Sequence, residues 1–576
     1  MMDLTRQTLE KRLEKYPEQQ RNFILLAYEV ADKCHKDKKR ASGDSYIIHP
    51  LAVALNIMRF GFDASTIAAA LLHDTIEDCG FKPETIQKTF GDNVRFLVEG
   101  VTKLKHIRYS AVQKRAESVR KMFLAVAEDI RVVIIKLYDR LHNMQTIQYI
   151  PKNKQQRIAL ETLELYAPLA YRLGIGELKG QLEDLAFPIV YPKEHAWLVQ
   201  EIKERIPQRT QYLKHLIPII KRELQKEEIE APDIHIRAKH YYSLWRKLVK
   251  NDMDFGSIYD LAAVRIIVQS IEDCYTVLGI IHKIWKPLPG RIKDYIALPK
   301  PNGYQSLHTT VFAEDGKIVE LQIRTHKMHE EAEFGIAAHW AYDEAGKSSL
   351  RAKATEQEST LIKQLQEWQH TFSDASGEEY LESLKIDFFK NRIFVLTPKG
   401  EVIDLPESAT PIDFAYYIHT DIGNRMMGAK INGKLVPFSY ELQSGDTVEI
   451  LVQKNKKPSP DWLKLAKTSV ARSKIRSSLK RAGIQLPKFQ GLKKAPKEFL
   501  LEVQVKNRIG MLKDITSVFA DAKINITVLH TKRDNADYPI IFFRCASPKK
   551  RTFNDALVEI QKIKGVINTK VTESKP

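Results

Sequence analysis

The sequence predicts a multidomain protein with an all-helical N-terminal region, a central α/β region and two small C-terminal modules of mixed structure. Three observations support this prediction. The chain has 576 residues, whereas a single hydrophobic core rarely grows beyond about 300 residues. Helical periodicity continues almost throughout residues 1–190, and the alternation typical of strands begins near His235. Two compact strand-rich patterns then occupy residues 386–452 and 498–576.

The composition narrows the class of partner and the compartment. A formal net charge of +18 and a pI near 9.3 indicate acidic partners, whether nucleotides, RNA or anionic membranes. Apolar runs such as residues 67–72 are too short to cross a bilayer, and the N-terminal segment has no apolar signal-peptide core. We therefore expect a cytoplasmic protein with no membrane partner. The widely spaced cysteines exclude a zinc ribbon and are typical of reduced thiols: Cys34, Cys79, Cys274 and Cys545.

A run in the helical region combines a buried pattern with a charged end. Residues 64–78, ASTIAAALLHDTIED, predict one mostly buried helix. On such a helix His73 and Glu77, and likewise Asp74 and Asp78, would be i and i+4 neighbours. The four side chains could then line one wall of a cavity.

Two further segments add possible metal ligands to this wall. His49 ends another apolar segment, and Asp139 and Asn143 are i and i+4 neighbours in KLYDRLHNM. With His73 and Asp74, these segments offer two imidazoles and two carboxylates, a set without thiolate that favours Mn²⁺, Fe²⁺ or Zn²⁺. A lone His-Asp dipeptide would mean little. The full set predicts metal-assisted phosphoester hydrolysis, in which the acids at the end of the run position or deprotonate a water.

The stretch 289–311, PGRIKDYIALPKPNGYQSLHTTV, is predicted to bind a polyphosphate. Its Pro-Asn-Gly-Tyr turn includes Gly303, which lets backbone approach a ligand closely, and Tyr304, which offers a flat surface for a base. Arginine forks and mobile lysine charges both suit phosphate oxygens. The cationic or proton-exchanging side chains of this stretch are Arg291, Lys293, Lys300 and His308. The alternative is a solvated basic loop beside a strand.

Two strand patterns place carboxylates near this loop. Residues 318–325, IVELQIRT, alternate so that Glu320, Gln322 and Arg324 share one face. Asp260 opens another apolar strand, LAAVRIIV. Two carboxylates on strands beside a cationic loop predict a magnesium-nucleotide site.

These motifs resemble known families. The histidines and aspartates of the helical region resemble the HD phosphohydrolase superfamily, and with the central loop the chain resembles the RelA/SpoT homologue family of bifunctional (p)ppGpp synthetase/hydrolases. The resemblance implies an HD-type domain whose Mn²⁺ ligands are His49, His73, Asp74 and Asp139, whose water-activating acids are Glu77 and Asp78, and whose nucleotide contacts are Arg40 and Asn143.

For the central region the resemblance implies a nucleotidyltransferase-like synthetase domain, which moves pyrophosphate from ATP to the 3′-hydroxyl of GDP or GTP. Asp260 and Glu320 would hold Mg²⁺, and Glu320 would also activate the hydroxyl. The Arg-x-Lys-Asp motif at residues 291–294 resembles that of bifunctional members. The implied substrate contacts are Arg237 on adenine with Lys239 beside it, Arg291, Lys293 and Lys300 on phosphates, Tyr304 on guanine, and Asn302, Gln305 and His308 near the acceptor.

The C-terminal third resembles two regulatory modules. Residues 386–452 resemble a TGS domain of β-grasp type, with Thr410 as a helix cap and His419 as a candidate contact to uncharged tRNA; a surface histidine with no task is the alternative. Residues 461–481 predict a basic helix that is either solvated or in contact with RNA. The final segment predicts a βαββαβ order and resembles an ACT domain, with residues 507–510 where such domains often bind small molecules.

The expected domains are 1–190 for the hydrolase, 191–345 for the synthetase with its connecting helices, 346–385 for a linker, 386–452 for TGS, 453–497 for the basic helix and linker, and 498–576 for ACT. The leading hypothesis is a bifunctional alarmone enzyme of the stringent response, acting on ATP, GDP, GTP and (p)ppGpp. One alternative is a hydrolase with a weak synthetase, and another is an RNA-associated sensing protein. Only about fifteen residues, 484–498, stand where long family members carry a helical region and a Cys-rich finger, so ribosome contact and oligomeric state stay open.

Overall fold

The computed structural model describes two compact units, residues 1–482 and 483–576, which are treated separately below. The described residues are 4–105, 128–229, 232–300, 302–335, 392–454, 456–482, 497–508, 510–522, 524–532, 539–547 and 550–573, with 122, 125, 372, 383, 386 and 387 singly. Apart from residues 372 and 383, the expected linker 346–385 lies outside them.

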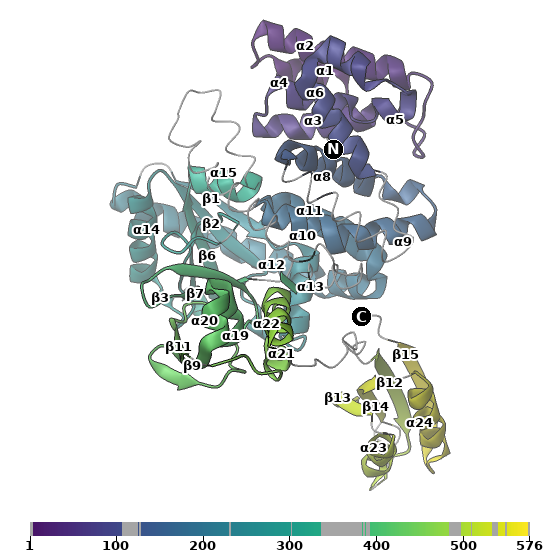
Figure 1. Ribbon diagram of the computed structural model, residues 1–576, viewed down its shortest axis with the longest axis vertical. Coiled ribbons are helices and arrows are strands. Elements are labelled where there is room, and N and C mark those ends of the chain that lie inside the picture. The colour runs from purple at the N-terminus through teal and green to yellow at the C-terminus, as the bar shows by residue number, and fades with distance from the viewer. Residues whose placement is uncertain are drawn as a thin grey trace. The chain divides into compact units, whose positions relative to one another are not determined.

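The N-terminal region is all-helical, as predicted, and runs from purple to blue in Figure 1. Its core is built largely from alanine, leucine, isoleucine and valine side chains of α2, α3, α4, α6 and α8. The helices are α1 (Arg6–Leu13), α2 (Glu18–His35), α3 (Ile48–Ile57), α4 (Ala64–Leu72), α5 (Thr75–Cys79), α6 (Pro83–Lys105), α8 (Ile130–Gln145), α9 (Lys152–Glu161), α10 (Ala167–Arg172), α11 (Gly176–Val190) and α12 (Pro192–Lys226), with short turns η1 (Met58–Phe60), η2 (Ile147–Tyr149) and η3 (Thr162–Tyr166).

The prediction of one helix over residues 64–78 is wrong. The helix breaks at His73 and Asp74, which cap α4 and α5 respectively. The Thr75 hydroxyl donates to the carbonyl of Leu72 at 2.6 Å, and such a side-chain bond competes with the helical backbone bond. The break therefore separates His73 from the helix that carries Glu77, whereas Asp74 and Asp78 keep their i and i+4 relation, since the Asp78 N–H donates to the Asp74 carbonyl at 2.9 Å.

The central region is a mixed sheet with helices, as predicted. Its strand order is β1-β2-β6-β5-β3, with β4 paired to β5; β2 and β6 are parallel and the other pairs are antiparallel. The elements are β1 (Asp233–Ala238), α13 (Tyr241–Lys250), η4 (Phe255–Ser257), β2 (Ala262–Val268), α14 (Ile271–Ile284), β3 (Lys286–Pro287), β4 (Lys293–Asp294), β5 (Leu307–Phe312), η5 (Glu314–Gly316), β6 (Ile318–Thr325) and α15 (His326–Phe334).

The two faces of this sheet differ in chemistry. Alternate residues of β2 and β6, such as Val264, Ile266 and Leu321, pack with α12 and α14 in one apolar core. Because successive side chains of a strand point to opposite faces, the intervening polar residues lie on the other face. That face carries Glu320 and Gln322.

The TGS-like module has the expected order of strands and helix. Thr410 caps α19 in a reciprocal capping box with Asp413. A sheet of order β10-β9-β11 and a hairpin of β7 and β8 form its core. The elements are β7 (Arg392–Leu396), β8 (Val402–Pro406), α19 (Pro411–Ile418), α20 (Thr420–Arg425), β9 (Met426–Ile431), β10 (Lys434–Val436) and β11 (Val448–Val452).

The expected single basic helix over residues 461–481 is two helices, α21 (Trp462–Leu465) and α22 (Ser469–Arg481). The Asp413 carboxylate accepts bonds from the backbone N–H groups of Lys467 and Thr468, at 3.0 and 2.8 Å, and so holds the break between them. The buried residues of α22 are apolar, so this face of the basic helix packs on protein.

The second unit has the βαββαβ order that the sequence predicts. Its sheet order is β13-β14-β12-β15, all antiparallel, and both helices contribute to one core. The elements are β12 (Lys497–Val505), α23 (Met511–Asp521), β13 (Asn525–Lys532), β14 (Ile540–Ser547), α24 (Lys550–Lys562) and β15 (Val566–Glu573). Across the described part of the whole chain, no helix is both long and apolar enough to span a membrane.

Candidate active sites

The helical break brings three of the predicted metal ligands together. His49 lies on α3, and His73 and Asp74 lie at the junction of α4 and α5; all three are buried. Their ligand atoms lie within 4.8 Å of one another. His49 Nε2 is 3.6 Å from Asp74 Oδ2, and His73 Nε2 is 3.4 Å from Asp74 Oδ1. The structure thus brings three of the four predicted ligands together at a helix break, and their role as metal ligands stays a prediction.

Both imidazoles are suited to bind a cation through a bare nitrogen. His73 Nδ1 lies 2.7 Å from the carbonyl oxygen of Ala70, which can only accept, so Nδ1 carries the proton. His73 Nε2 has no hydrogen-bond partner among the described residues, although it is buried. Burial also lowers the pKa of His49, and a neutral imidazole is the form that binds metal. The donor set therefore fits a divalent ion.

Asp139, the fourth predicted ligand, lies beside this group but is held by other residues. Its Oδ1 is 3.3 Å from His49 Nε2, while Lys136 donates to Oδ2 at 2.5 Å. Asn143 also donates to Asp139. Burial would raise the pKa of the Asp139 carboxyl, but the Lys136 ammonium and His49 hold it well below its usual range. Asp139 is therefore an anion whose charge Lys136 already balances.

The proposed nucleotide contacts of this domain lie next to each other. Arg40 Nη2 donates to Asn143 Oδ1 at 2.8 Å, and the Arg40 guanidinium lies 5.7 Å from the ring of Tyr46. Tyr46 in turn donates to Asp74 Oδ2 at 3.0 Å. Burial and Asp74 raise the pKa of Tyr46, so it stays protonated as a donor. A chain of polar contacts thus connects the predicted nucleotide side to the histidine cluster.

The acids Glu77 and Asp78 lie on α5, which has only five residues. Lys38 donates to the backbone carbonyl of Asp78. Because Asp74 caps one end of α5 and Cys79 forms the other, both acids are tied to the candidate metal site through one short helix.

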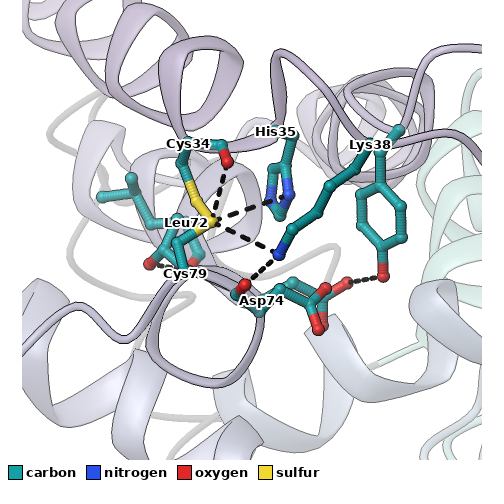
Figure 2. The surroundings of a disulfide bond; sticks show 9 residues. Cys34, His35, Lys38, Leu72, Asp74 and Cys79 are labelled. Carbon is teal, nitrogen blue, oxygen red and sulfur yellow. Dashed lines mark hydrogen bonds between the residues drawn. A yellow bond between two sulfur atoms is a disulfide. The ribbon is translucent and has the colours of Figure 1, made fainter.

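The expectation of reduced thiols is wrong for two of the four cysteines. Cys34 and Cys79 form a disulfide between the ends of α2 and α5, with their Cα atoms 5.8 Å apart (Figure 2). Their separation of 45 residues hides this pairing in the sequence. Cys274 and Cys545 are free and buried, as expected of structural thiols. Burial raises the pKa of each of these two thiols to about 12.

The central sheet carries a cleft of about 250 Å³ on its polar side. Six predicted residues line it: Arg237, Lys239, Asp260, Lys300, Asn302 and Tyr304. Its far wall comes from α10, α11 and the turn between them, a contribution that the sequence did not indicate. At Gly174 in that turn φ is +78°, and a Cβ would lie 2.8 Å from the carbonyl oxygen of Asn302. Glycine therefore permits the close approach of this wall to the loop.

Lysines surround the Asp260 carboxylate. Lys239 donates to one oxygen and Lys247 to the other, the latter at 2.7 Å. The pKa of Asp260 is lowered, because the two ammonium groups outweigh the effect of burial. The like charge of Asp260 opposes the lowering of the pKa of Glu320, which lies on β6, the strand paired with β2. Carboxylates of this kind are the ligands that a divalent cation such as Mg²⁺ takes.

Glu320 lies at the end of a hydrogen-bonded relay. Its Oε1 is 3.4 Å from His308 Nδ1, and His308 Nε2 is 2.8 Å from the hydroxyl of Tyr304. Burial lowers the pKa of His308, so the ring is neutral. One tautomer satisfies both contacts: Tyr304 donates to Nε2, and Nδ1 carries the proton that faces Glu320. The pKa of Glu320 is lowered despite burial, because His308 and Gln322 donate to it.

Lys300 is placed between aromatic rings. Its ammonium lies 4.4 Å from the centre of the Tyr295 ring and 4.6 Å from that of Tyr304. Burial, with Lys293 nearby, lowers the pKa of Lys300 to about 8. This cation is therefore desolvated, which strengthens its attraction to phosphate oxygens.

Four predicted phosphate or acceptor contacts do not line the cleft, and neither does Glu320: the four are Arg291, Lys293, Gln305 and His308. Arg291 and Lys293 are exposed, and the Arg291 guanidinium lies 5.9 Å from the Tyr259 ring. Gln305 donates to the carbonyl of Ile296 at 3.2 Å. These roles stay predictions.

Sequence reasoning missed one buried arginine, Arg265, and gave no role to another, Arg324. Arg265 and Arg324 lie on adjacent strands, are 3% and 0% exposed, and share the single carboxylate of Glu333 at 3.1 and 3.3 Å. Burial and their mutual repulsion lower the pKa of Arg265 to about 10. The excess positive charge favours a polyanionic ligand in front of it. The sequence did carry a signal for Arg265, which is the one arginine inside the otherwise apolar strand LAAVRIIV.

An ion pair joins the cleft wall to the sheet domain. His240 Nδ1 lies 2.8 Å from Asp184 Oδ2, and its Nε2 is 3.7 Å from Glu177 on the same helix. Although burial lowers it, the pKa of His240 is raised to about 9 by these two carboxylates.

We expect His240→Gln to lower the thermal stability of the chain at pH 6 and to have little effect at pH 10. The raised pKa means that the stabilisation is complete below pH 6.5 and disappears as pH rises through about 9. At about 1.36 kcal/mol per pKa unit, the difference is about 3 kcal/mol at most. Melting curves across this range measure it. His215→Gln, at an exposed pair with Glu314, is the control; an equal loss at both pH values would contradict the assignment.

His419 lies at the surface of the TGS-like module. It is exposed and caps α20, where its Nδ1 accepts from the Asp421 N–H at 3.2 Å. A local capping role therefore accounts for one ring nitrogen and leaves Nε2 facing solvent.

Four family models match the chain. They are an HD domain over residues 27–176, the region found in RelA / SpoT proteins over 236–347, a TGS domain over 393–452 and an AHAS small subunit-like ACT domain over 501–568.

Several curated proteins are similar to most of this chain. A guanosine-3′,5′-bis(diphosphate) 3′-pyrophosphohydrolase of Aquifex aeolicus is 49% identical over 82% of this chain and 66% of its own length. A GTP pyrophosphokinase of Streptomyces coelicolor is 48% identical over 79% and 55%. A bifunctional (p)ppGpp synthase/hydrolase RelA of Mycobacterium tuberculosis is 45% identical over 80% and 63%. The chain thus spans 55% to 66% of the length of these relatives.

Among solved structures, small alarmone synthetase 2 from Bacillus subtilis covers 30% of this chain and 98% of its own, with 24% identity and a TM-score of 0.21. Fold and family models together define a class of multidomain protein that joins an HD-type domain to a sheet domain of the kind found in RelA / SpoT proteins, a TGS domain and an ACT domain. The chain belongs to the RelA/SpoT family.

Proposed function

We propose that the chain is a bifunctional alarmone enzyme of the stringent response. It transfers pyrophosphate from ATP to the 3′-hydroxyl of GDP or GTP, and it hydrolyses (p)ppGpp to GDP or GTP and pyrophosphate. The observation that carries the proposal is the presence of two candidate sites in one unit: a buried histidine and aspartate cluster between helices, and a basic cleft on a sheet. The Mycobacterium tuberculosis relative, named for both activities, supports it.

In the hydrolase site, His49, His73 and Asp74 would hold a divalent ion, for which we propose Mn²⁺, with Asp139 as a fourth ligand. When bound, the ion would polarise the phosphoryl oxygen and acidify a water. The side chains of α5 then contribute a base: Glu77 and Asp78 orient the water and take its proton. Tyr46 keeps Asp74 oriented through its hydroxyl. Arg40 and Asn143, already in contact with each other, hold the guanosine nucleotide.

In the synthetase site, Asp260 and Glu320 would hold Mg²⁺, which neutralises charge on the transferred group. Glu320 takes the proton of the 3′-hydroxyl as its oxygen attacks the β-phosphorus of ATP, and AMP leaves. His308 keeps Glu320 oriented through the relay from Tyr304. The desolvated Lys300 ammonium attracts the phosphate oxygens, with Arg237 and Lys239 at the other side of the cleft.

The two reactions oppose each other, so the TGS and ACT modules are proposed to bias the chain toward one of them. We place the protein in the cytoplasm, with uncharged tRNA and the ribosome as partners through His419 and the basic α22. The exposed Nε2 side of His419 supports a contact to the tRNA end.

The decisive experiment uses Asp74→Ala in the full chain, so that hydrolysis does not remove product. With ATP, GDP and Mg²⁺, nucleotide chromatography is expected to show a 3′-pyrophosphorylated guanosine nucleotide. The wild-type chain with Mn²⁺ and purified product is expected to show its loss. Lack of product, even with uncharged tRNA and ribosomes, would replace the proposal by a hydrolase-dominant one. A tRNA effect that His419→Ala leaves unchanged would remove His419 from the tRNA contact.

A further inference from the structure

The Cys34–Cys79 disulfide lies where it can act on the hydrolase site. It joins the C-terminal ends of α2 and α5. The opposite end of α5 is Asp74, whose carboxylate belongs to the candidate metal group. Because α5 has only five residues, a restraint at Cys79 is also a restraint on the acids between these ends. The bond therefore attaches the proposed water-activating segment to a long, packed helix.

Two further contacts connect the C-terminal end of α2 and the residues after it to α5 and its cap, Asp74. Lys38, which follows α2, donates to the carbonyl of Asp78, so the same segment holds α5 a second time. His35 stacks on Tyr46 with ring centres 4.6 Å apart, and Tyr46 donates to Asp74. Residues 34–38 thus contact α5 at the Cys79 sulfur and at the Asp78 carbonyl. Through Tyr46 they also contact Asp74, the candidate metal-ligand residue at the start of α5.

The chemistry around the sulfurs favours reversible exchange. Both cysteines are partly exposed, so small thiols can reach them. The Lys38 ammonium lies 3.9 Å from Cys79 Sγ, and His35 Nδ1 lies 3.8 Å from it (Figure 2). A neighbouring cation stabilises a departing thiolate, and the partial exposure of this pair contrasts with the burial of Cys274 and Cys545. Disulfides that form inside cells are usually catalytic or redox-sensing rather than structural.

We propose that Cys34 and Cys79 form a reversible redox-modification site, modified by small-molecule disulfides, that controls the hydrolase site. In the oxidised chain α5 is fixed and the acids are positioned for hydrolysis. In the reduced chain α5 loses this covalent bond and keeps the Lys38 and Tyr46 contacts and its packing, and hydrolysis slows. The synthetase cleft, built on other elements, keeps its rate. The control of hydrolysis rests on the proposed function, whereas the restraint on α5 does not.

The exchange is balanced in two steps. A thiolate of one cysteine attacks the external disulfide, forms a mixed disulfide and releases one external thiolate. The thiolate of the other cysteine then attacks the protein sulfur of the mixed disulfide and releases the second. The two cysteine sulfurs lose two electrons, the external disulfide gains them, and the two cysteine protons pass to the departing thiolates.

The experiment compares the full chain equilibrated with oxidised or reduced dithiothreitol. Thiol alkylation and mass spectrometry determine the state of the Cys34–Cys79 pair. Amide exchange of the peptide covering residues 73–80 is expected to be faster in the reduced chain. The rate constant kcat for (p)ppGpp hydrolysis is expected to fall about tenfold on reduction, since small displacements of catalytic groups have effects of this size or larger. Pyrophosphate transfer from ATP is expected to stay within about twofold.

The variants separate the bond from its surroundings. Cys34→Ser, which leaves α5 itself unaltered, is expected to show the reduced rate and exchange in both buffers. Cys545→Ala, in the other unit, is expected to respond as the wild type does. Failure of the two cysteines to pair in oxidised dithiothreitol, or identical amide exchange in both states, would overturn the proposal. Absence of hydrolysis in either state would overturn the hydrolase assignment instead, and amide exchange would still decide whether the bond restrains α5.

Discussion

Replacing Glu320 with glutamine is expected to reduce pyrophosphate transfer from ATP to GDP by about 10³-fold in kcat, since loss of a general base typically costs 10² to 10⁴. The amide keeps the size of the side chain and can still face Gln322, but it neither takes the proton of the 3′-hydroxyl nor balances a divalent cation. The ratio of kcat between variant and wild type, both in the Asp74→Ala background, measures the effect. Hydrolysis of (p)ppGpp by the single variant Glu320→Gln is expected to stay unchanged.

The control for Glu320→Gln is Glu314→Gln. Glu314 precedes the same strand, is exposed and pairs with His215 at 3.2 Å, so its loss removes a carboxylate without touching the cleft. A fall in transfer of less than about tenfold for Glu320→Gln would remove Glu320 from the role of base. If KM for GDP rose while kcat stayed the same, Glu320 would bind substrate without taking its proton.

Residue patterns with a strict period were enough to predict much of this fold. Alternation in residues 318–325 placed Glu320 and Gln322 on one face, and the sheet has them there. The Thr410 cap with its capping box at Asp413 likewise predicted where α19 begins. These predictions succeeded because strand alternation and capping are set by residues close in the sequence.

One local feature and two features that depend on distant residues were not predicted. The local one is the break at His73 and Asp74, where the Thr75 hydroxyl donates to the Leu72 carbonyl inside an otherwise strongly helical run. The cleft wall from α10 and α11 requires the close approach at Gly174. The Cys34–Cys79 bond joins residues whose separation carries no local signal. The cleft wall and the disulfide involve tertiary contacts that period and propensity do not contain.

The largest expected effect in the hydrolase site is that of Asp139→Asn, which acts on both activity and stability. Hydrolysis is expected to fall by about 10³-fold or more, since the amide lacks the charge that a metal ligand supplies. The N-terminal domain is also expected to lose about 3 to 5 kcal/mol, because Lys136, only 6% exposed, is left as an uncompensated buried cation. Hydrolysis assays and denaturant unfolding of the full chain measure the two effects.

The double variant Lys136→Met, Asp139→Asn separates these two effects. Replacing the buried ammonium with an apolar side chain of similar length removes the uncompensated charge, so most of the lost stability is expected to return. Hydrolysis is not expected to return, because the carboxylate beside His49 is still absent. Asp92→Asn, at a carboxylate with 79% of its side chain exposed, should change neither property. Recovery of hydrolysis in the double variant would show that Asp139 acts only through its pairing with Lys136.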